Sequence, residues 1–242
     1  SGLTTETYII LALGALLGAT ISGVTGIGGG LIYLPILAWG VGLRMAVPYL
    51  AVLLVVGNIS RAWLTKQNID WRVLGRFALG GIPGAMLGAT LYTGLSTFWI
   101  SKALGVYLLS YVALSFTRAN WPRKASLKSI TVMGVPAGFV SAVVGGAGPV
   151  VAPWFLRYGL MKEAFVGTEA VAAAIMHVTK LGVWGTAGMI GAGDLLLLLP
   201  LGLLMVVGSY FGLKLVSRMH AKTFRAILLL TLAAVGVRFL FY

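Results

Sequence analysis

The chain contains 242 residues, of which 59% are hydrophobic and only 10% are charged, and its formal net charge is +13. A soluble domain typically carries about 25% charged residues, so this composition indicates an integral membrane protein rather than a soluble one. The basic residues lie mostly between apolar segments, where they act as topology signals, so we expect no nucleic acid as a partner. The absence of cysteine excludes disulfides, thiolate metal sites and cysteine catalysis, and we predict no metal, no cofactor and no enzymatic activity.

Apolar segments follow one another along the chain in two similar sets. The first set lies at residues 8–25, 31–41, 46–64, 73–93 and 98–116, and the second at 130–144, 150–158, 164–184, 195–216 and 224–241. The second segment of each set is too short to span a hydrocarbon core of about 30 Å at about 1.5 Å per residue. We therefore predict that the first two segments of each set form a helical hairpin and that the other three cross the membrane. Residues 8–25 are long for a hairpin arm and nearly span the core.

A glycine-rich break separates the two arms of each predicted hairpin. The first break runs through residues 26–30 and precedes Pro35, and the second runs through residues 145–148 and precedes Pro153. A shift of 118 residues aligns the two breaks, and a shift of 124 later aligns Asp70 with Asp194. The ordered series of matches indicates an internal duplication, and paired breaks of this kind point to the binding site of a transporter.

Charge in the loops decides between two topologies. If each break lies in a hairpin, the second half is inverted relative to the first, and most loop lysines and arginines lie on the cytoplasmic side. The alternative, with four crossings per half and parallel repeats, would place several of them outside. We therefore predict an all-α integral membrane protein of two inverted repeats, residues 3–118 and 130–242, joined by a cytoplasmic linker at residues 119–129.

The breaks can bind an anion through their backbone. The short helix after each break begins with unpaired N–H groups and the positive end of its dipole. Glycine also lets a ligand approach the backbone closely. We therefore predict substrate-binding residues at the breaks, which are Thr25, Gly28, Gly29, Gly30, Gly146 and Gly148. The alternative is that the glycines only allow helices to pack closely.

Two cations lie within the predicted spans at nearly equivalent positions. Arg61 falls near one end of its segment, and the shift of 118 places it on Thr179, next to Lys180. Charged groups within spans are costly and usually functional, so we predict that both bind the anion, with Asn58 one turn before Arg61. The alternative is that both side chains snorkel to the membrane surface.

The second half carries two further titratable groups in the segment of Lys180. His177 is close to mid-span, and Glu169 follows Gly167 and Thr168 near the expected start of the helix. We predict that Glu169 and His177 couple transport to protons and that His177 also contacts substrate. The simpler alternatives are a dipole partner at the helix N-terminus for Glu169 and an interhelical hydrogen bond for His177.

These motifs resemble the sulfite exporter TauE/SafE family. The resemblance rests on the two breaks with their prolines and on the run Ala164-Phe-Val-Gly-Thr-Glu-Ala170, and it extends over nearly the whole chain. It implies a polytopic permease for sulfur-containing anions such as sulfite, sulfoacetate or other organosulfonates, driven by an ion gradient rather than by ATP. Ala147 and Pro149 depart from the glycine pattern, so we expect the second break to be shaped differently.

The sequence thus predicts a secondary transporter that exports small sulfur-containing anions by alternating access. We expect it to be a multi-pass protein of the cytoplasmic (inner) membrane of a prokaryote. Its expected partners are the anion, the lipid bilayer, and protons or another coupling ion. A passive anion channel and a non-transport membrane subunit remain open alternatives to this function. The oligomeric state is also left open, with a homodimer as one form.

Overall fold

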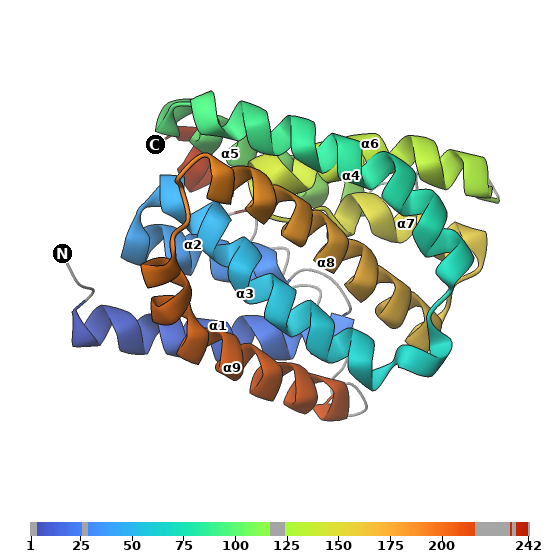
Figure 1. Cartoon of the computed structure of the whole chain (residues 1–242), viewed down its shortest axis with the longest axis horizontal. Coiled ribbons are helices and arrows are strands. Elements are labelled where there is room, and N and C mark those ends of the chain that lie inside the picture. Colours follow the sequence, from blue (N-terminus) through green and yellow to red (C-terminus); the bar gives the residue numbers. More distant parts are fainter. Residues whose placement is uncertain (1–3, 26–28, 117–123, 216–232, 234–235, 242) are drawn as a thin grey trace.

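The computed structural model of the chain describes residues 4–25, 29–116, 124–215, 233 and 236–241, and this part contains helices and loops but no strand. Figure 1 shows most of the helices lying along the long axis of the molecule. In chain order they are α1 (Thr5–Thr25), α2 (Gly29–Val41), α3 (Leu43–Leu64), the 3-10 turn η1 (Lys66–Asn68), α4 (Trp71–Gly94), α5 (Thr97–Phe116), α6 (Leu127–Val144), α7 (Gly148–Tyr158), α8 (Lys162–Thr186) and α9 (Ala192–Leu215).

The predicted all-α fold is confirmed, and nine of the ten predicted segments correspond to a helix with similar bounds. The tenth, residues 224–241, lies mostly outside the described residues, although residues 236–241 are helical. Ser101 of α5 donates a hydrogen bond to the carbonyl oxygen of Phe239 at 2.6 Å, so this last turn packs against α5.

Six described helices, α1, α3, α5, α6, α8 and α9, are long and apolar enough to cross a membrane. With 13 and 11 residues, α2 and α7 are short, as predicted for the second arm of each hairpin. The first arms are longer than a simple hairpin requires, since α1 and α6 contain 21 and 18 residues and both qualify as spans. α4 is 24 residues long but is not among the six, because its glycines together with Arg72 and Arg76 lower its hydropathy.

Polar residues and glycine set the helix ends around the centre of the molecule. Asp70 accepts hydrogen bonds from the backbone N–H groups of Arg72 and Val73 and so caps the start of α4. Gly145 ends α6 in the left-handed region, with φ of 90°, which glycine adopts without a Cβ penalty. The chain can therefore turn sharply from α6 into the short helix α7.

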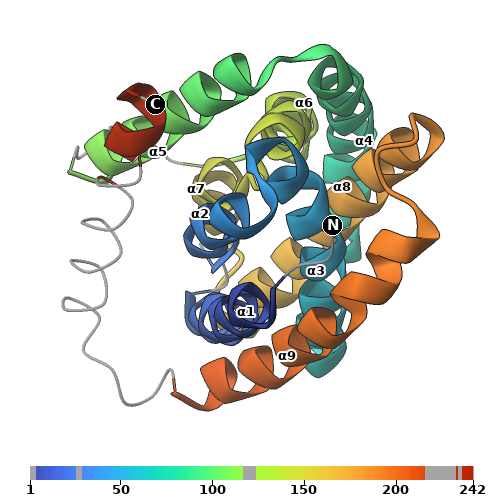
Figure 2. The same cartoon turned by 90° about the vertical axis from the view of Figure 1, so that its left-hand side faces the viewer.

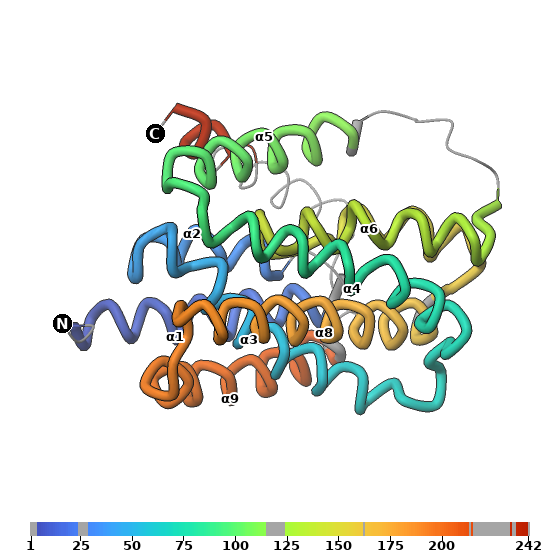
Figure 3. Tube along the Cα trace, turned by 45° about the horizontal axis from the view of Figure 1, so that its top comes forward, coloured from blue at the N-terminus to red at the C-terminus, as the bar shows by residue number. Residues whose placement is uncertain are grey.

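Corresponding helices of the two halves run in opposite directions. Figure 1 shows α3 running from left to right and α8 beside it from right to left, and Figure 3 shows the same for α1 and α6. In the end-on view of Figure 2, the short helices α2 and α7 both lie inside the bundle. Figure 1 shows α2 toward the left of the molecule and α7 toward the right, so the two lie at different levels along the long axis.

One kind of close helix packing is made twice, by equivalent residues of the two halves. A Cβ added at Gly84 of α4 would lie 2.1 Å from the carbonyl oxygen of Val135 on α6. One added at Gly208 of α9 would lie 2.6 Å from the carbonyl oxygen of Leu16 on α1. Gly84 and Gly208 are 124 residues apart, and Leu16 and Val135 are 119 apart. Glycine therefore allows the same backbone contact between α4 and α6 and between α9 and α1.

The helix bounds give the register of the duplication. α1 and α6 end at Thr25 and Val144, α2 and α7 begin at Gly29 and Gly148, and α3 and α8 begin at residues 43 and 162. Each pair is separated by 119 residues, one more than the shift of 118 that aligns Pro35 with Pro153 in the sequence. Gly148 therefore corresponds in space to Gly29 rather than to Gly30.

Candidate functional site

A small cavity of about 40 Å³ lies between the two halves. Its walls come from α1, α2, α3, α6, α7, α8 and the break before α7, and the residues are Ser22, Gly30, Leu31, Leu54, Asn58, Arg61, Ser141, Gly146, Ala147, Gly148, Pro149, Glu169, Ala173, Met176 and His177. Since a single water needs about 10–15 Å³ of such space, the cavity has room for a few waters or for a small polyatomic ion.

Both short helices reach this cavity with their first turns. Gly30 is the second residue of α2 and Gly148 is the first residue of α7. Ala147, the N-cap of α7, makes no side-chain capping bond to the first turn. The positive ends of two helix dipoles therefore lie at one cavity, with no side-chain oxygen capping α7.

Each half places a cation against a serine of its own hairpin. Arg61 Nη1 donates to the carbonyl oxygen of Ser22 at 3.2 Å. Lys180 Nζ donates to the carbonyl oxygen of Ser141 at 2.7 Å and to its Oγ at 3.1 Å. Both the cations and the serines are 119 residues apart, so Lys180 itself is the counterpart of Arg61, where the sequence placed Thr179.

Both cations are buried inside the helix bundle. The relative exposure of Arg61 is 3% and that of Lys180 is 0%. The interpretation that they snorkel to the membrane surface is therefore wrong for both, because each side chain is covered by protein. Lys180 does not line the cavity but lies behind Ser141, with its Nζ 5.7 Å from the centroid of the Trp184 ring.

Arg61 belongs to a buried polar cluster that faces the cavity. Its Nη2 donates to Asn58 Oδ1 and lies 3.7 Å from Glu169 Oε2. α8 begins at Lys162, so Glu169 lies in the second turn or beyond, and the interpretation as a first-turn dipole partner is wrong. The structure instead makes Glu169 the counter-ion of Arg61 within the bundle.

Two buried polar atoms at the cavity make no hydrogen bond to the described protein. They are Glu169 Oε2 and His177 Nδ1. Both residues line the cavity, and their exposures are 5% and 2%. Buried polar atoms are almost always satisfied, so these two atoms are suited to hold a water, a proton or a ligand in the cavity.

The structure brings most of the predicted site residues together. Gly30, Asn58, Arg61, Gly146, Gly148, Glu169 and His177 all line the cavity. Gly29 instead packs against α1, because a Cβ there would lie 2.0 Å from the carbonyl oxygen of Gly18. Gly28 and the Thr25 side chain lie outside the described residues. Within the described part, no group of three or more His, Cys, Asp or Glu side chains could hold a metal ion.

Ser22 and Ser141 lie close to the two breaks, where their hydroxyl groups can donate hydrogen bonds to an oxyanion. In the structure their carbonyl oxygens also accept from the two cations. The signal in the sequence is the shift of 119, which places Ser22 on Ser141, Asn58 on His177 and Arg61 on Lys180 together.

A family model described as "Sulfite exporter TauE/SafE" matches residues 10–239, which is nearly the whole chain. No curated protein and no solved structure matches the chain.

Proposed function

The chain belongs to the sulfite exporter TauE/SafE family, and on this premise we propose that it is a secondary transporter that exports sulfite or a small organosulfonate. The observation that carries the proposal is the cavity where both helix breaks meet Arg61 and Glu169. Its size suits a small oxyanion, and its polar atoms supply the positive potential such an ion needs.

In the proposed bound state the anion lies between the first turns of α2 and α7. Arg61 provides charge-assisted hydrogen bonds, Asn58 orients the guanidinium, and the backbone around Gly146 and Gly148 approaches the anion closely. Lys180 adds long-range positive potential from behind Ser141. His177 faces the same space with an unpaired ring nitrogen.

Proton coupling follows from competition for Arg61. An anion that binds Arg61 takes the place of Glu169 as the counter-ion. A buried carboxylate without a counter-charge is costly, so Glu169 takes up a proton when the anion binds and releases it when the anion leaves. Anion and proton then move in the same direction. One proton on a dianion such as sulfite leaves a net charge of −1, which the inside-negative membrane potential drives outward. His177 offers the neighbouring site for the proton.

Alternating access would follow from motion of one inverted repeat against the other. Support comes from the equivalent contacts of α4 with α6 and of α9 with α1, and from the opposite directions of α3 and α8. In the proposed topology the ends of α3 and α9 that carry Lys66 and Lys214 lie at the cytoplasmic face of a prokaryotic inner membrane.

Flux measurements in proteoliposomes test the proposal. The purified protein is reconstituted, labelled sulfite is added, and its movement is followed with and without a pH gradient. We expect uphill movement that stops when the gradient is collapsed. Flux that is only downhill and insensitive to pH would instead identify a passive anion channel. A lack of any flux of sulfite, sulfoacetate or taurine, with a folded protein, would indicate a non-transport subunit.

A further inference from the structure

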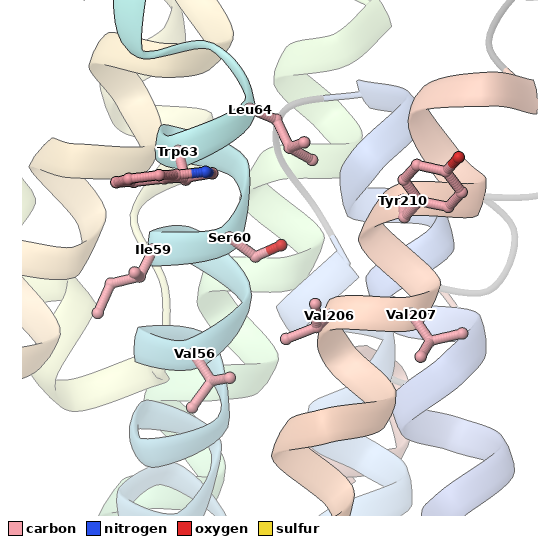
Figure 4. A pocket seen from close by; sticks show the side chains of 8 residues that line it. All are labelled: Val56, Ile59, Ser60, Trp63, Leu64, Val206, Val207 and Tyr210. Atoms are coloured by element: carbon pink, nitrogen blue, oxygen red, sulfur yellow. The ribbon is translucent and has the colours of Figure 1, made fainter.

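An apolar groove of about 720 Å³ lies on the outside of the bundle between α3 and α9. Figure 4 shows Ile59, Trp63 and Leu64 on one side of it and Val206, Val207 and Tyr210 on the other. These side chains are between 37% and 69% exposed. The groove therefore opens outward, away from the central cavity and toward the lipid.

The groove forms where two close helices separate. A Cβ added at Gly202 would lie 3.4 Å from Val56 Cγ2, and one added at Gly57 would lie 3.7 Å from Met205 Cβ. Beyond these contacts Trp63 and Tyr210 stand on opposite sides of the opening (Figure 4). Two helices that touch at one level and then diverge leave an elongated apolar space, whose shape suits an acyl chain.

One end of the groove carries two lysines stacked on its aromatic rings. Lys66 Nζ lies 4.3 Å from the ring centroid of Trp63, and Lys214 Nζ lies 4.5 Å from that of Tyr210. Both lysine side chains are exposed, one just after α3 and the other in the last turn of α9. Aromatic rings and lysines at helix ends are typical of the level of the lipid head groups.

The duplication supplies an internal comparison. The shift of 119 places Gly182 and Gly185 at the positions of Trp63 and Lys66, and the shift of 124 places Met86 and Thr90 at those of Tyr210 and Lys214. The equivalent side of α8 and α4 thus carries neither the rings nor the cations at these positions. The combination is therefore a property of this groove and not a consequence of the repeat.

We propose that the groove between α3 and α9 binds an anionic phospholipid, with an acyl chain along the apolar walls and the phosphate between Lys66 and Lys214. The charge of the two lysines selects an anionic over a zwitterionic head group. The site lies outside the transport cavity, so its failure and the failure of the proposed transport function are separate outcomes.

Delipidated full-length protein in detergent tests the site by thermal unfolding and native mass spectrometry with added lipid. We expect phosphatidylglycerol to raise the unfolding temperature more than phosphatidylcholine with the same acyl chains, and to bind more tightly. Inorganic phosphate alone should have no effect. Equal binding of the two lipids, or an equal shift with phosphate, would overturn the proposal.

Variants then locate the site. Each lysine should contribute about fivefold in affinity, since about 1 kcal/mol is expected per basic residue near anionic lipid. Lys66→Gln with Lys214→Gln should therefore abolish the preference for phosphatidylglycerol. Arg72→Gln with Lys124→Gln removes the same charge from exposed positions away from the groove and should preserve it.

A groove-filling variant separates a lipid from a second protein copy. Val206→Trp should weaken the binding of both lipids without changing the oligomeric state. If Val206→Trp instead dissociates a dimer, the groove is a contact between copies and the lipid proposal is wrong.

Discussion

The two halves of the chain meet the central cavity with equivalent backbone positions and different side chains. Ser22 and Ser141 each accept from a buried cation, Arg61 in the first half and Lys180 in the second. Glu169, however, stands where the first half has the buried residue Leu50. The carboxylate that the second half supplies lies 3.7 Å from the cation of the first half.

This difference indicates that the two halves share equivalent positions in their helices but not the same side-chain chemistry. The scaffold delivers two cation positions, and a single carboxylate makes them unequal. Arg61 Nη2 lies 3.7 Å from the carboxylate of Glu169, whereas Lys180 lies behind Ser141 with its Nζ near the Trp184 ring. We therefore propose that counter-ions exchange at Arg61 and that Lys180 only adds to the positive electrostatic potential.

The largest expected effect separates the two cations. Arg61→Met removes the group that we propose contacts the anion, so sulfite flux in proteoliposomes should fall about a thousandfold, which corresponds to about 4 kcal/mol. Lys180→Met removes only a more distant charge and should cost about tenfold. Size-exclusion profiles check that both variants fold. Equal losses would show that the two positions act as equivalent binding sites.

The second comparison concerns the two breaks. In Gly29→Ala the new Cβ would lie 2.0 Å from a backbone carbonyl oxygen of α1, whereas no atom of the described residues, apart from the chain neighbours, lies within 4 Å of a Cβ at Gly146. Overpacking typically costs about 1–3 kcal/mol, so Gly29→Ala should destabilise the protein by about 3 kcal/mol. Gly146→Ala should leave the unfolding temperature in detergent nearly unchanged. A larger loss for Gly146→Ala would contradict the assignment of Gly29 to packing.

The third prediction concerns the carboxylate that is present in only one half. One pH unit across the membrane is worth 1.36 kcal/mol, so with one proton per anion it can sustain a sulfite gradient of about tenfold. Glu169→Gln keeps the shape of the side chain but cannot release a proton. It should abolish this accumulation and retain downhill flux. Accumulation that persists in Glu169→Gln would move the coupling to another group.

The smallest expected effects concern the free energy of unfolding, for substitutions at two equivalent residues outside the cavity. Tyr49 donates to Asp194 Oδ1, and Thr168 Oγ1 accepts from the backbone N–H of Asp70 at 2.9 Å. Tyr49 and Thr168 are 119 residues apart, and the two aspartates are 124 apart. A neutral hydrogen bond contributes about 1 kcal/mol and one to a charged acceptor about 1.5–3 kcal/mol.

Thermal unfolding of Tyr49→Phe and Thr168→Val measures this pair. Tyr49→Phe should cost more than Thr168→Val, because its acceptor is a carboxylate. The reverse order would show that the hydrogen-bond energies do not follow the charge of the partner.

Much of the fold could be predicted because apolar runs and glycine breaks are local signals. The bounds of α2 and α7 follow from the breaks before Leu31 and Val150, and their short lengths follow from where the apolar runs stop. The register could not be read in the same way. Gly-rich stretches match at several shifts, and the starts of α3 and α8, together with the serine contacts of Arg61 and Lys180, select 119 over 118.

The candidate site, like the fold, could be predicted in part from the sequence, and the rest required the structure. A charged residue in an apolar segment is visible in sequence, so Arg61, Glu169, His177 and Lys180 could all be named. Whether a cation reaches the surface depends on which helices cover it, and this is a property of packing. The same holds for the carbonyl oxygens of Ser22 and Ser141, since every residue has one and only the fold selects its partner.

The sequence by itself determined an all-helical membrane protein, and it predicted a repeated set of segments with ionisable groups near two glycine breaks, because hydropathy, glycine and charge act within one segment. Only the tertiary structure decided that the breaks share one cavity and that Arg61 pairs with Glu169 from the other half. It also decided that Lys180 lies behind Ser141 and does not line the cavity. These contacts join residues far apart in the chain, and their partners are fixed by the packing of α3 against α8 rather than by any local pattern.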